Sequence, residues 1–551
     1  MSALRVTTAA EAAARDQAAI AAGTASFALM LQAGTTAAAA ILRDFATRLS
    51  HGVAVFAGGG NNGGDAYIVA AQLSRAGVVV RVHAAAPPRT PDAARAMHLA
   101  APTLVHGAPT GHERLVVDGL LGTGHRGALR APVLAACTRV SLAREGGATV
   151  VALDVPSGLD ATTGEIAEGS SAAHATLTFG TIKRGLLLSR AHAGRIVLLD
   201  IGLGLGRDGD ADLGDGAWRW RDAQGLARWL PPIAWNAHKG RRGRVAVVGG
   251  HEGMAGAVIL AMRAALAAGA GLAHAIVDAP SVAAVQLTVP QALAERWPVR
   301  TGSRRADSLP SGIAAGSAVG AAGDDADSDT LRRCDALAVG PGLGRGARSS
   351  QLLERIVTDH RDRPMVLDAD ALWLLAEVAT MLGTDAASLL RHWTRQSRSV
   401  VCTPHEGEFA RLIGTPVPAD WDARVGALRE FAVRGGATVL LKGTPTLVAT
   451  PDGGPITVVP HGTSLLATGG SGDVLSGLIV ALLGQGLAPL EATVCGATVH
   501  GRAAELATAR LGGIRGGTLE QVFEALPLAW RQLERAVPYP PGVLADLPSP
   551  T

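Results

Sequence analysis

The chain has 551 residues, more than one hydrophobic core usually supports, so two domains are expected. Hydrophobic residues make up 48% of the sequence and aromatic residues only 3%, so alanine, valine and leucine must fill the cores, which favours packed α/β layers. A net charge of +3 without a block of like charges argues against a nucleic-acid surface, and we expect no nucleic-acid partner.

The cysteines and the apolar stretches indicate the compartment. Four cysteines lie far apart with no C-x-x-C pair, so neither a zinc knuckle nor a disulfide framework is expected, and a reducing cytoplasmic location follows. The N-terminus has no apolar core behind a basic start and does not resemble a signal peptide. Arg263 and His274 interrupt the most apolar stretch, Met254–Val277, which we interpret as a buried helix and strand rather than a membrane span.

Apolar, β-branched runs alternate with alanine-rich helical segments, a pattern typical of parallel sheets with crossover helices. In chain order, the predicted strands are Val53–Ala57, Val78–His83, Arg114–Val117, Thr149–Leu153, Ala175–Phe179, Arg195–Leu199, Arg244–Val248, Leu272–Val277, Ala336–Val339, Met365–Leu367, Ser399–Cys402 and Thr438–Leu441. The glycine-rich stretch Gly202–Gly216 is the natural linker, and Thr301–Asp329 is predicted to be a mobile insertion. We therefore predict domains at 1–216 and 217–535, followed by a frayed, proline-rich tail at 536–551.

The first polar loop follows Val53–Ala57 and contains Gly58, Gly60 and Gly63 in the spacing G-x-G-x-x-G. The next strand ends in arginine and histidine instead of an acid, which argues against an ordinary NAD dehydrogenase. Asn62, Asp118 and Ser157 follow three different strands and offer only oxygen ligands, which suit a hard cation. Aspartates at strand ends often only cap the next helix, so a purely structural role is the alternative to the cation site.

The second polar loop is Gly469-Gly470-Ser471-Gly472-Asp473, which leads into the apolar helical run Val474–Leu483. Glycines before a helix let backbone N–H groups bind an anion such as phosphate, and Asp473 is our candidate catalytic base. A plain helix cap is the alternative, although the glycines cost entropy that a cap does not require. Because no Gly-Lys dipeptide occurs, a Walker P-loop is excluded.

Lysine is rare, with Lys183, Lys239 and Lys442 the three lysines among 50 basic side chains. A compact ammonium group can act where a planar guanidinium cannot, so each position is a candidate for function. Lys442 begins the loop Lys442–Thr446, which offers a cation, a bare backbone and two hydroxyls for phosphate or ribose. No role is assigned to Lys183 or Lys239.

Residues Trp218–Trp530 closely resemble the ADP- or ATP-dependent NAD(P)H-hydrate dehydratases, a branch of the ribokinase-like superfamily. The motifs that carry the resemblance are His238-Lys239-Gly240, Val248-Gly249-Gly250, Met254–Ala257, Val339–Gly344, Leu367–Leu372, Cys402–Glu408, Lys442–Thr446 and Gly469–Asp473. By this resemblance, Ala257, Gly344 and His405 contact the hydrated nicotinamide nucleotide and Asp473 is the base. The adenine nucleotide is held by Lys442, Gly443, Thr444, Pro445, Thr446 and Gly472.

Residues Leu4–Leu203 are similar to the NAD(P)H-hydrate epimerases, with a Rossmann-like three-layer α/β/α fold implied. The resemblance is specific at Asn61–Asp65 and at Asp154–Gly158. It implies K⁺ bound by Asn62, Asp118 and Ser157, and Asp154 as the acid/base. The residues implied to bind the hydrate are Asn61, Asn62, Gly63, Gly64, Asp65, Gly122, Thr123, Gly124, His125, Arg126, Gly127, Ala128 and Asp154.

Together the two resemblances predict nicotinamide nucleotide repair, in which one domain interconverts the R and S hydrates and the other dehydrates the S form at the expense of ADP or ATP. Mg²⁺ is expected to accompany the phosphates. The partners would be NADH and NADPH hydrates and the adenine nucleotide, with no membrane and a homo-oligomeric assembly of unspecified size. Two alternatives stay open: a ribokinase-like kinase of a vitamin precursor, and an N-terminal domain that serves only as a non-catalytic binding module.

Overall fold

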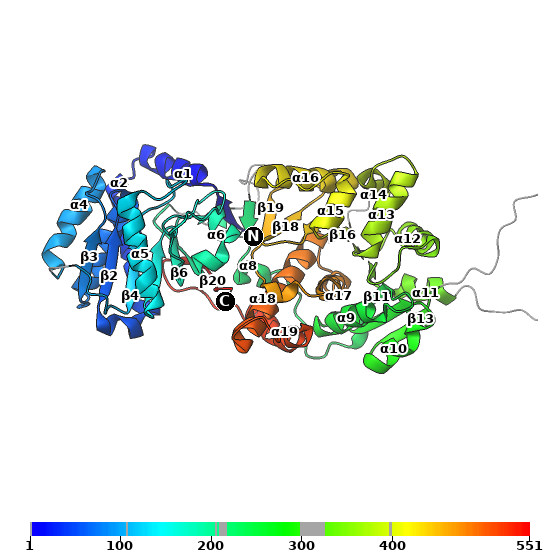
Figure 1. The fold of residues 1–551 in the computed structure, drawn as a ribbon. Coiled ribbons are helices and arrows are strands. Elements are labelled where there is room, and N and C mark those ends of the chain that lie inside the picture. The colour runs from blue at the N-terminus through cyan, green and yellow to red at the C-terminus, as the bar shows by residue number, and fades with distance from the viewer. Residues whose placement is uncertain are drawn as a thin grey trace, which may run out of the picture.

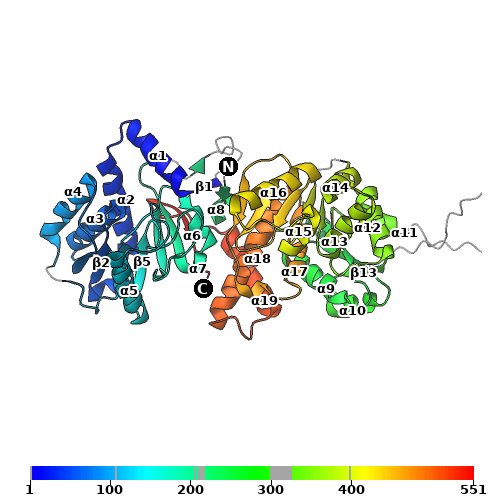
Figure 2. The same cartoon turned by 45° about the horizontal axis from the view of Figure 1, so that its top comes forward.

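The computed structural model describes residues 3–105, 108–203, 207–208, 218–297, 326–395 and 399–550. They form two α/β lobes that lie side by side, as Figures 1 and 2 show from two directions. Most of the predicted linker and the predicted insertion up to residue 325 fall outside the described residues. Residues at the end of the insertion form helix α11 (Ala326–Arg333).

The N-terminal lobe is built on one sheet with the strand order β20-β8-β6-β5-β4-β2-β3. All its pairs are parallel except β20–β8, so the helices cross over both faces. Its strands are β2 (Val53–Ala57), β3 (Val80–Ala84), β4 (Leu115–Gly119), β5 (Thr149–Leu153), β6 (Ala175–Phe179), β8 (Arg195–Leu199) and β20 (Val543–Leu547). Its helices are α1 (Ala9–Ala21), α2 (Ser26–Asp44), α3 (Asn61–Arg75), α4 (Pro91–Ala100), α5 (Ala131–Glu145), α6 (Arg184–Leu188) and α7 (Arg190–Ala193), with 3₁₀ turns at η1 (Ala46–His51) and η2 (Ala101–Thr103).

The second sheet has the order β13-β12-β11-β14-β15-β16-β17-β18-β19-β10-β1-β7, with β9 beside β1. Its strands are β1 (Ala3–Thr7), β7 (Ile182–Lys183), β9 (Arg207–Asp208), β10 (Trp218–Trp220), β11 (Arg244–Gly249), β12 (Leu272–Val277), β13 (Leu293–Arg296), β14 (Ala336–Val339), β15 (Met365–Leu367), β16 (Val400–Cys402), β17 (Thr438–Leu441), β18 (Thr446–Ala449) and β19 (Ile456–Val459). Its helices besides α11 are α8 (Ala223–Ala227), α9 (Ala255–Ala267), α10 (Ser281–Thr288), α12 (Ala347–Asp359), α13 (Asp370–Met381), α14 (Ala386–Thr394), α15 (Glu406–Ile413), α16 (Trp421–Gly435), α17 (Ser471–Gly484), α18 (Pro489–Leu511) and α19 (Leu519–Glu534), with 3₁₀ turns at η4 (Lys239–Arg241) and η5 (Ser464–Leu466). The run from β13 to β17 is parallel, so the expected α/β class is confirmed in both lobes.

The two ends of the chain are exchanged between the lobes. Strand β1 pairs antiparallel with β10 and parallel with β7, so it bridges the second sheet to a strand of the N-terminal lobe. Strand β20 pairs antiparallel with β8, and in Figure 1 this red strand lies within the cyan lobe. The expectation of a frayed tail at 536–551 is therefore wrong for residues 543–547, because Ala545 and Leu547 are buried against that sheet.

Helix α17 is the central helix of the C-terminal lobe. It is apolar nearly all round and packs closely on α9, since a Cβ on Gly477 would lie 2.1 Å from the Ala261 carbonyl oxygen. The stretch Met254–Val277 forms α9 followed by β12, which confirms a helix and a strand there. Among the described residues no single helix is long and apolar enough to cross a membrane; the bent pair α13 and α14 passes only when the two helices are taken together.

Candidate active sites

The N-terminal candidate site lies at the carboxyl edge of its sheet, where parallel strands place the ends of β2, β4 and β5 together. Asp154 follows β5 with a left-handed φ of 63°, a conformation that non-glycine residues rarely adopt. The Lys183 Nζ atom lies 2.5 Å from Asp154 Oδ1 and also donates to the Phe179 carbonyl at 2.7 Å. The two groups therefore form an ordered ion pair with the ammonium almost fully buried.

Asp65 is the fifth residue of α3 and lies near Asp154, whose charge acts on it. Burial raises its pKa well above the ordinary range, and the neighbouring carboxylates Asp154 and Asp16 raise it further. The Asn61–Asp65 segment thus brings an acid that resists ionisation close to Asp154. Asn61 is exposed, and its Oδ1 accepts a hydrogen bond from Thr90 at 2.9 Å.

The three expected cation ligands are brought together. Ser157 Oγ donates to Asp118 Oδ1 at 2.5 Å, and the Leu121 N–H donates to Ser157 Oγ at 2.9 Å. Asn62 Nδ2 donates to the Leu121 carbonyl at 2.6 Å, whereas its Oδ1 is buried with no hydrogen-bond partner among the described residues. An unsatisfied buried acceptor beside two other oxygen groups is a suitable environment for a hard cation.

The segment Gly122–Ala128 leaves β4 and passes this cluster. A Cβ on Gly122 would lie 3.2 Å from Asn62 Cβ, so the loop begins in contact with the proposed cation ligands. His125 N–H donates to the Gly122 carbonyl at 3.2 Å, and Arg126, Gly127 and Ala128 are exposed. The loop can therefore cover a ligand bound at the sheet edge.

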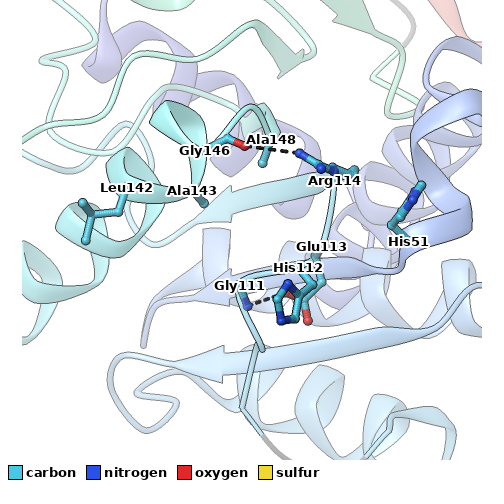
Figure 3. Close-up of a pocket in the computed structure, with 9 residues that line it drawn as sticks. All are labelled: His51, Gly111, His112, Glu113, Arg114, Leu142, Ala143, Gly146 and Ala148. Carbon is cyan, nitrogen blue, oxygen red and sulfur yellow. Dashed lines mark hydrogen bonds between the residues drawn. The ribbon is translucent and has the colours of Figure 1, made fainter.

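A separate polar cavity of about 370 Å³ opens on the N-terminal lobe (Figure 3). It is lined by residues that precede β4 and β5, among them His112, Glu113, Arg114 and Ala148. These positions lie at the amino-terminal edge of the sheet, opposite Asp118 and Asp154. The cavity is therefore not part of the candidate site.

The C-terminal candidate site is organised around Lys442, which directly follows β17. Its Nζ lies 2.8 Å from Asp368 Oδ1 and 4.0 Å from Glu408 Oε2. Ser476 of α17 donates to Asp368 Oδ2 at 2.7 Å. A Cβ on Gly472 would lie 3.1 Å from Lys442 Nζ, so the amino end of α17 faces the ammonium group directly.

Asp473 lies in the first turn of α17 beside this cluster. Burial, with the neighbouring carboxylate Asp368, raises the pKa of Asp473 to about 7 although Lys442 acts to lower it. The pKa of Lys442 is raised: burial opposes this, but Asp368 and Glu408 outweigh it, so the ammonium stays charged. A carboxylate with a pKa near neutrality is suited to general-base catalysis.

The other expected substrate contacts, Ala257, Gly344 and His405, come after β11, β14 and β16, which belong to the same parallel run as β17. The Gly344 N–H donates to Asp370 Oδ2 at 2.9 Å, and Ala257 approaches the same loop, since a Cβ on Gly342 would lie 3.2 Å from Ala257 Cβ. His405 caps α15 through Nδ1, which accepts from Gly407 N at 3.0 Å, and its side chain is 60% exposed. His405 is linked to the centre through Glu408, which lies between it and Lys442.

The Lys442–Thr446 loop connects β17 to the antiparallel β18. The Lys442 N–H donates to the Pro404 carbonyl at 2.9 Å, and Thr446 Oγ1 donates to the Gly443 carbonyl at 3.2 Å. The Thr444–Pro445 peptide bond is cis. The loop is thus a tight turn that presents Gly443 and Thr444 beside Lys442.

Two residues central to these sites had no predicted role. Lys183 was noted for its rarity, yet its partner Asp154 is 29 residues away, and only the structure joins them. Asp368 stood within a quoted motif without an assignment, although it contacts both Lys442 and Ser476. The signal for Asp368 was its place directly after a strand, the position that made Asp154 and Asp118 candidates.

Among the described residues no group of three or more His, Cys, Asp or Glu side chains is arranged to hold a metal.

Comparison with known proteins identifies both lobes. Residues 245–527 match the family model described as NAD(P)H-hydrate dehydratase, and residues 26–185 match the model described as YjeF-related protein N-terminus. Two proteins named bifunctional NAD(P)H-hydrate repair enzyme Nnr are similar over most of the chain. The one from Escherichia coli (strain K12) is 33% identical over 90% of this chain and 88% of its own, and the one from Moorella thermoacetica is 34% identical over 93% and 94%.

A solved structure titled as the ADP/ATP-dependent NAD(P)H-hydrate dehydratase from Bacillus subtilis, co-crystallized with ATP/Mg²⁺, is 25% identical to this chain. It aligns with 57% of this chain and 97% of its own, with a TM-score of 0.44. The family models and the relatives matched over most of the chain determine the family assignment. The chain therefore belongs to the family of bifunctional NAD(P)H-hydrate repair enzymes, with an epimerase domain followed by a dehydratase domain.

Proposed function

We propose that this enzyme interconverts the C6 epimers of hydrated NADH and NADPH in its N-terminal lobe and dehydrates the S epimer in its C-terminal lobe, with ADP as co-substrate. The observation that carries the proposal is the cluster of Asp473, Lys442 and Asp368 at the amino end of α17. It brings a base and the start of a helix to a cation: Asp473 follows Gly472, and a Cβ on Gly472 would lie 3.1 Å from Lys442 Nζ.

The nucleotide would bind where Lys442 and the start of α17 meet. Lys442, Gly443, Thr444, Pro445, Thr446 and Gly472 are the proposed contacts. The ammonium group and the backbone N–H groups at the helix terminus both attract phosphate oxygens. Gly472 has no side chain to fill the space in front of Lys442 Nζ, which supports a phosphate position there.

Dehydration requires the poor leaving group at C6 to become a good one. Ala257, Gly344 and His405 hold the hydrate. Asp473 takes the proton of the C6 hydroxyl while the oxygen of that hydroxyl attacks the terminal phosphoryl group of ADP. The bond to AMP breaks and a phosphate ester forms at C6. The C6–O bond then breaks as the ring nitrogen donates its lone pair, releasing phosphate, and loss of a ring proton restores the dihydronicotinamide.

Mg²⁺ is proposed to accompany the nucleotide, with Glu408, whose Oε2 lies 4.0 Å from Lys442 Nζ, as a carboxylate that could hold it. Bound Mg²⁺ supplies charge neutralisation on the phosphate oxygens. We propose ADP in preference to ATP, which direct comparison of the two nucleotides tests.

In the epimerase lobe, Asp154 is the proposed acid/base. Lys183, Thr178 and the Phe179 N–H all donate to its Oδ1. We infer that Oδ2 is the oxygen that exchanges a proton with the C6 hydroxyl, while Lys183 fixes the orientation of the carboxylate. The proposed substrate contacts are Asn61–Asp65 and Gly122–Ala128, including Arg126 as an electrostatic contact to phosphate.

K⁺ is the proposed cation of this lobe, held by Asn62, Asp118 and Ser157. The buried Asn62 Oδ1 without a hydrogen-bond partner supports the fit. Bound K⁺ would supply a fixed positive charge beside the substrate and fasten the Gly122–Ala128 loop.

The decisive experiment supplies mixed-epimer NADH hydrate with ADP or ATP and follows recovery of the reduced-nicotinamide absorbance. Asp473→Asn is expected to abolish recovery. Asp154→Asn is expected to retain the rapid phase of one epimer and slow the other. No recovery by the wild-type enzyme with either nucleotide would reject the proposal.

The same assay distinguishes the two alternatives. A kinase of a vitamin precursor would release a stable phosphate ester, whereas this enzyme should release AMP and inorganic phosphate from ADP. A non-catalytic N-terminal module would leave the slow phase unchanged in Asp154→Asn. We also propose a cytoplasmic homo-oligomer; light scattering on the purified enzyme measures its size.

A further inference from the structure

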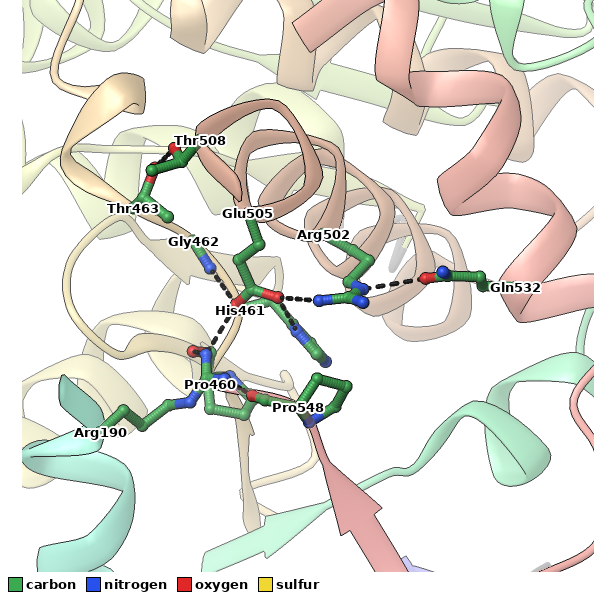
Figure 4. Close-up of polar contacts among 10 residues, drawn as sticks. All are labelled: Arg190, Pro460, His461, Gly462, Thr463, Arg502, Glu505, Thr508, Gln532 and Pro548. Carbon is green, nitrogen blue, oxygen red and sulfur yellow. Dashed lines mark hydrogen bonds and ion pairs between the residues drawn. The ribbon is translucent and has the colours of Figure 1, made fainter. Parts of the chain in front are cut away.

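A buried polar cluster joins the two lobes (Figure 4). Arg190, from α7 of the N-terminal lobe, places Nη1 2.7 Å from Oε1 of Glu505, on α18 of the C-terminal lobe. The two side chains are only 5% and 1% exposed. Arg190 also donates to the carbonyl oxygens of Pro460 and Pro548, so one guanidinium contacts α18, the end of β19 and the C-terminal segment.

Glu505 in turn holds the backbone that follows β19. Its Oε1 accepts from the Gly462 N–H at 3.1 Å, and its Oε2 lies 3.2 Å from His461 Nδ1. The same segment is pressed onto α18, because a Cβ on Gly501 would lie 2.4 Å from the His461 carbonyl oxygen. Glu505 thus determines where residues 460–462 lie.

Residues 463–470 connect this point to the dehydratase site. Thr463 Oγ1 is hydrogen-bonded to Thr508 Oγ1 of α18 at 2.9 Å, and Thr463 also caps η5. Backbone bonds then continue, from Leu466 N to the Thr463 carbonyl at 3.0 Å and from Ser471 N to the Thr468 carbonyl at 3.2 Å. The segment leads directly into α17, which contains Gly472 and Asp473, so its anchor at Gly462 helps set the start of that helix.

A buried carboxylate keeps this geometry only while its charge is compensated. Burial alone would raise the pKa of Glu505, but His461 and Arg190 outweigh it and hold the pKa well below its usual range. Arg502 makes a fourth contact, 3.0 Å from Oε2, so the loss of Arg190 would leave Oε1 with only the Gly462 N–H.

We propose that Arg190, although it belongs to the epimerase lobe, is a positioning residue for the dehydratase site. It compensates Glu505 and thereby fixes the segment 460–470 that sets the start of α17. The inference rests on the roles proposed above for Gly472 and Asp473. It implies that the epimerase lobe is required for full dehydratase activity.

The test compares Arg190→Met with Arg195→Met in the full-length enzyme. Arg195 pairs with Asp546 of β20 at 2.5 Å and with Asp44 at 3.1 Å, but makes no contact with Glu505 or with residues 460–470 among those described. Arg190→Met should lower dehydratase kcat/KM about tenfold, as expected when a reacting group is displaced, and leave the epimerisation rate unchanged. Arg195→Met should lower the melting temperature without changing dehydratase kcat/KM.

Two further variants keep the test decisive. Arg190→Met combined with Glu505→Gln also removes the carboxylate charge that Arg190 balanced and should recover most of the lost activity, whereas Arg190→Lys retains a cation and should show a smaller loss. Hydrogen exchange of residues 462–470, measured without substrate, should be faster in Arg190→Met than in Arg195→Met. Equal exchange in those two variants, or a parallel loss of both activities, would overturn the proposal. The exchange measurement uses no substrate, so its outcome does not depend on the proposed function.

Discussion

Asp473 should make the folded enzyme less stable at the pH values where its carboxylate is ionised and can act as a base. Its pKa is raised from 3.8 to about 7, so the unfolded chain gives up this proton more readily than the native protein does. The native state is therefore disfavoured progressively as the pH rises above about 4, and the full cost is present above about pH 7. Asp473→Asn removes the ionisable group while preserving its shape.

The magnitude follows from the two pKa values. Each pH unit between them corresponds to about 1.4 kcal/mol, so the difference between 3.8 and about 7 is worth about 4 kcal/mol at pH 8. Asp473 is partly open to solvent, which reduces this to about 2–4 kcal/mol. Among the described residues no hydrogen bond to the Asp473 carboxylate is present, so the substitution should break none.

The assay is thermal unfolding of Asp473→Asn and wild type from pH 4 to pH 8. The variant should be inactive as a dehydratase yet melt at least about 4 °C higher at pH 8, with the difference vanishing near pH 4. Asp385→Asn is the control of opposite sign: burial acts to raise the pKa of Asp385, but hydrogen bonds from Ser388 and the charge of Arg434 hold it below 3.8. A gain for Asp473→Asn that is independent of pH, or a loss at pH 8, would refute the reasoning.

Three further predictions test the two sites and the tail. The dehydratase rate should fall about tenfold per pH unit below about pH 7, where Asp473 becomes protonated. Because Lys442 lowers the pKa of Asp473, Lys442→Gln should move this acidic limb of the pH–rate profile to higher pH. A move of the limb to lower pH would contradict the assignment of the base. Lys183→Met should slow epimerisation at least about a hundredfold and leave dehydration unchanged. Lys183→Arg should not restore the epimerisation rate, because a planar guanidinium does not replace the compact ammonium group. Rate measurements on each epimer test both variants. Deleting residues 543–551 should cost about 3–5 kcal/mol, since Val543 and Leu547 are buried, and hydrogen exchange should accelerate in β8 and not in β13.

Much of the fold could be predicted because local pattern and final structure agree. The apolar runs at Val53–Ala57, Thr149–Leu153 and Leu272–Val277 form strands with those bounds. Residues that follow parallel strands meet at one edge, which made Asp118 a candidate from its order along the chain. Asp154 was assigned by the family resemblance, and Lys442 was first noted for the rarity of lysine. The sites depended on this rule more than on any single motif.

The parts that were missed depend on pairings between distant residues. Strands β1, β10 and β20 are short, and each is stabilised by a partner far away in the sequence, so no local periodicity marks them. The proline-rich composition of the tail correctly signals poor local structure, but an edge of the N-terminal sheet supplies the missing hydrogen bonds. Lys183 and Asp154 likewise became partners only when β5 and β7 were placed in space.

The exchange of the chain ends bears on why the two activities occupy one polypeptide. Leu4 and Val6 of β1 share a hydrophobic cluster with Trp218 and Trp220, and Leu547 of β20 belongs to the same cluster. A cut at the predicted boundary between residues 216 and 217 would leave β1 in one half and its partner β10 in the other, and would separate β20 from β8 in the same way. Each half would then expose an unpaired sheet edge and part of a shared core, both of which are unfavourable in water. The lobes carry separate catalytic groups, but these shared elements make their folding interdependent, and the Arg190–Glu505 contact adds a buried ion pair between them.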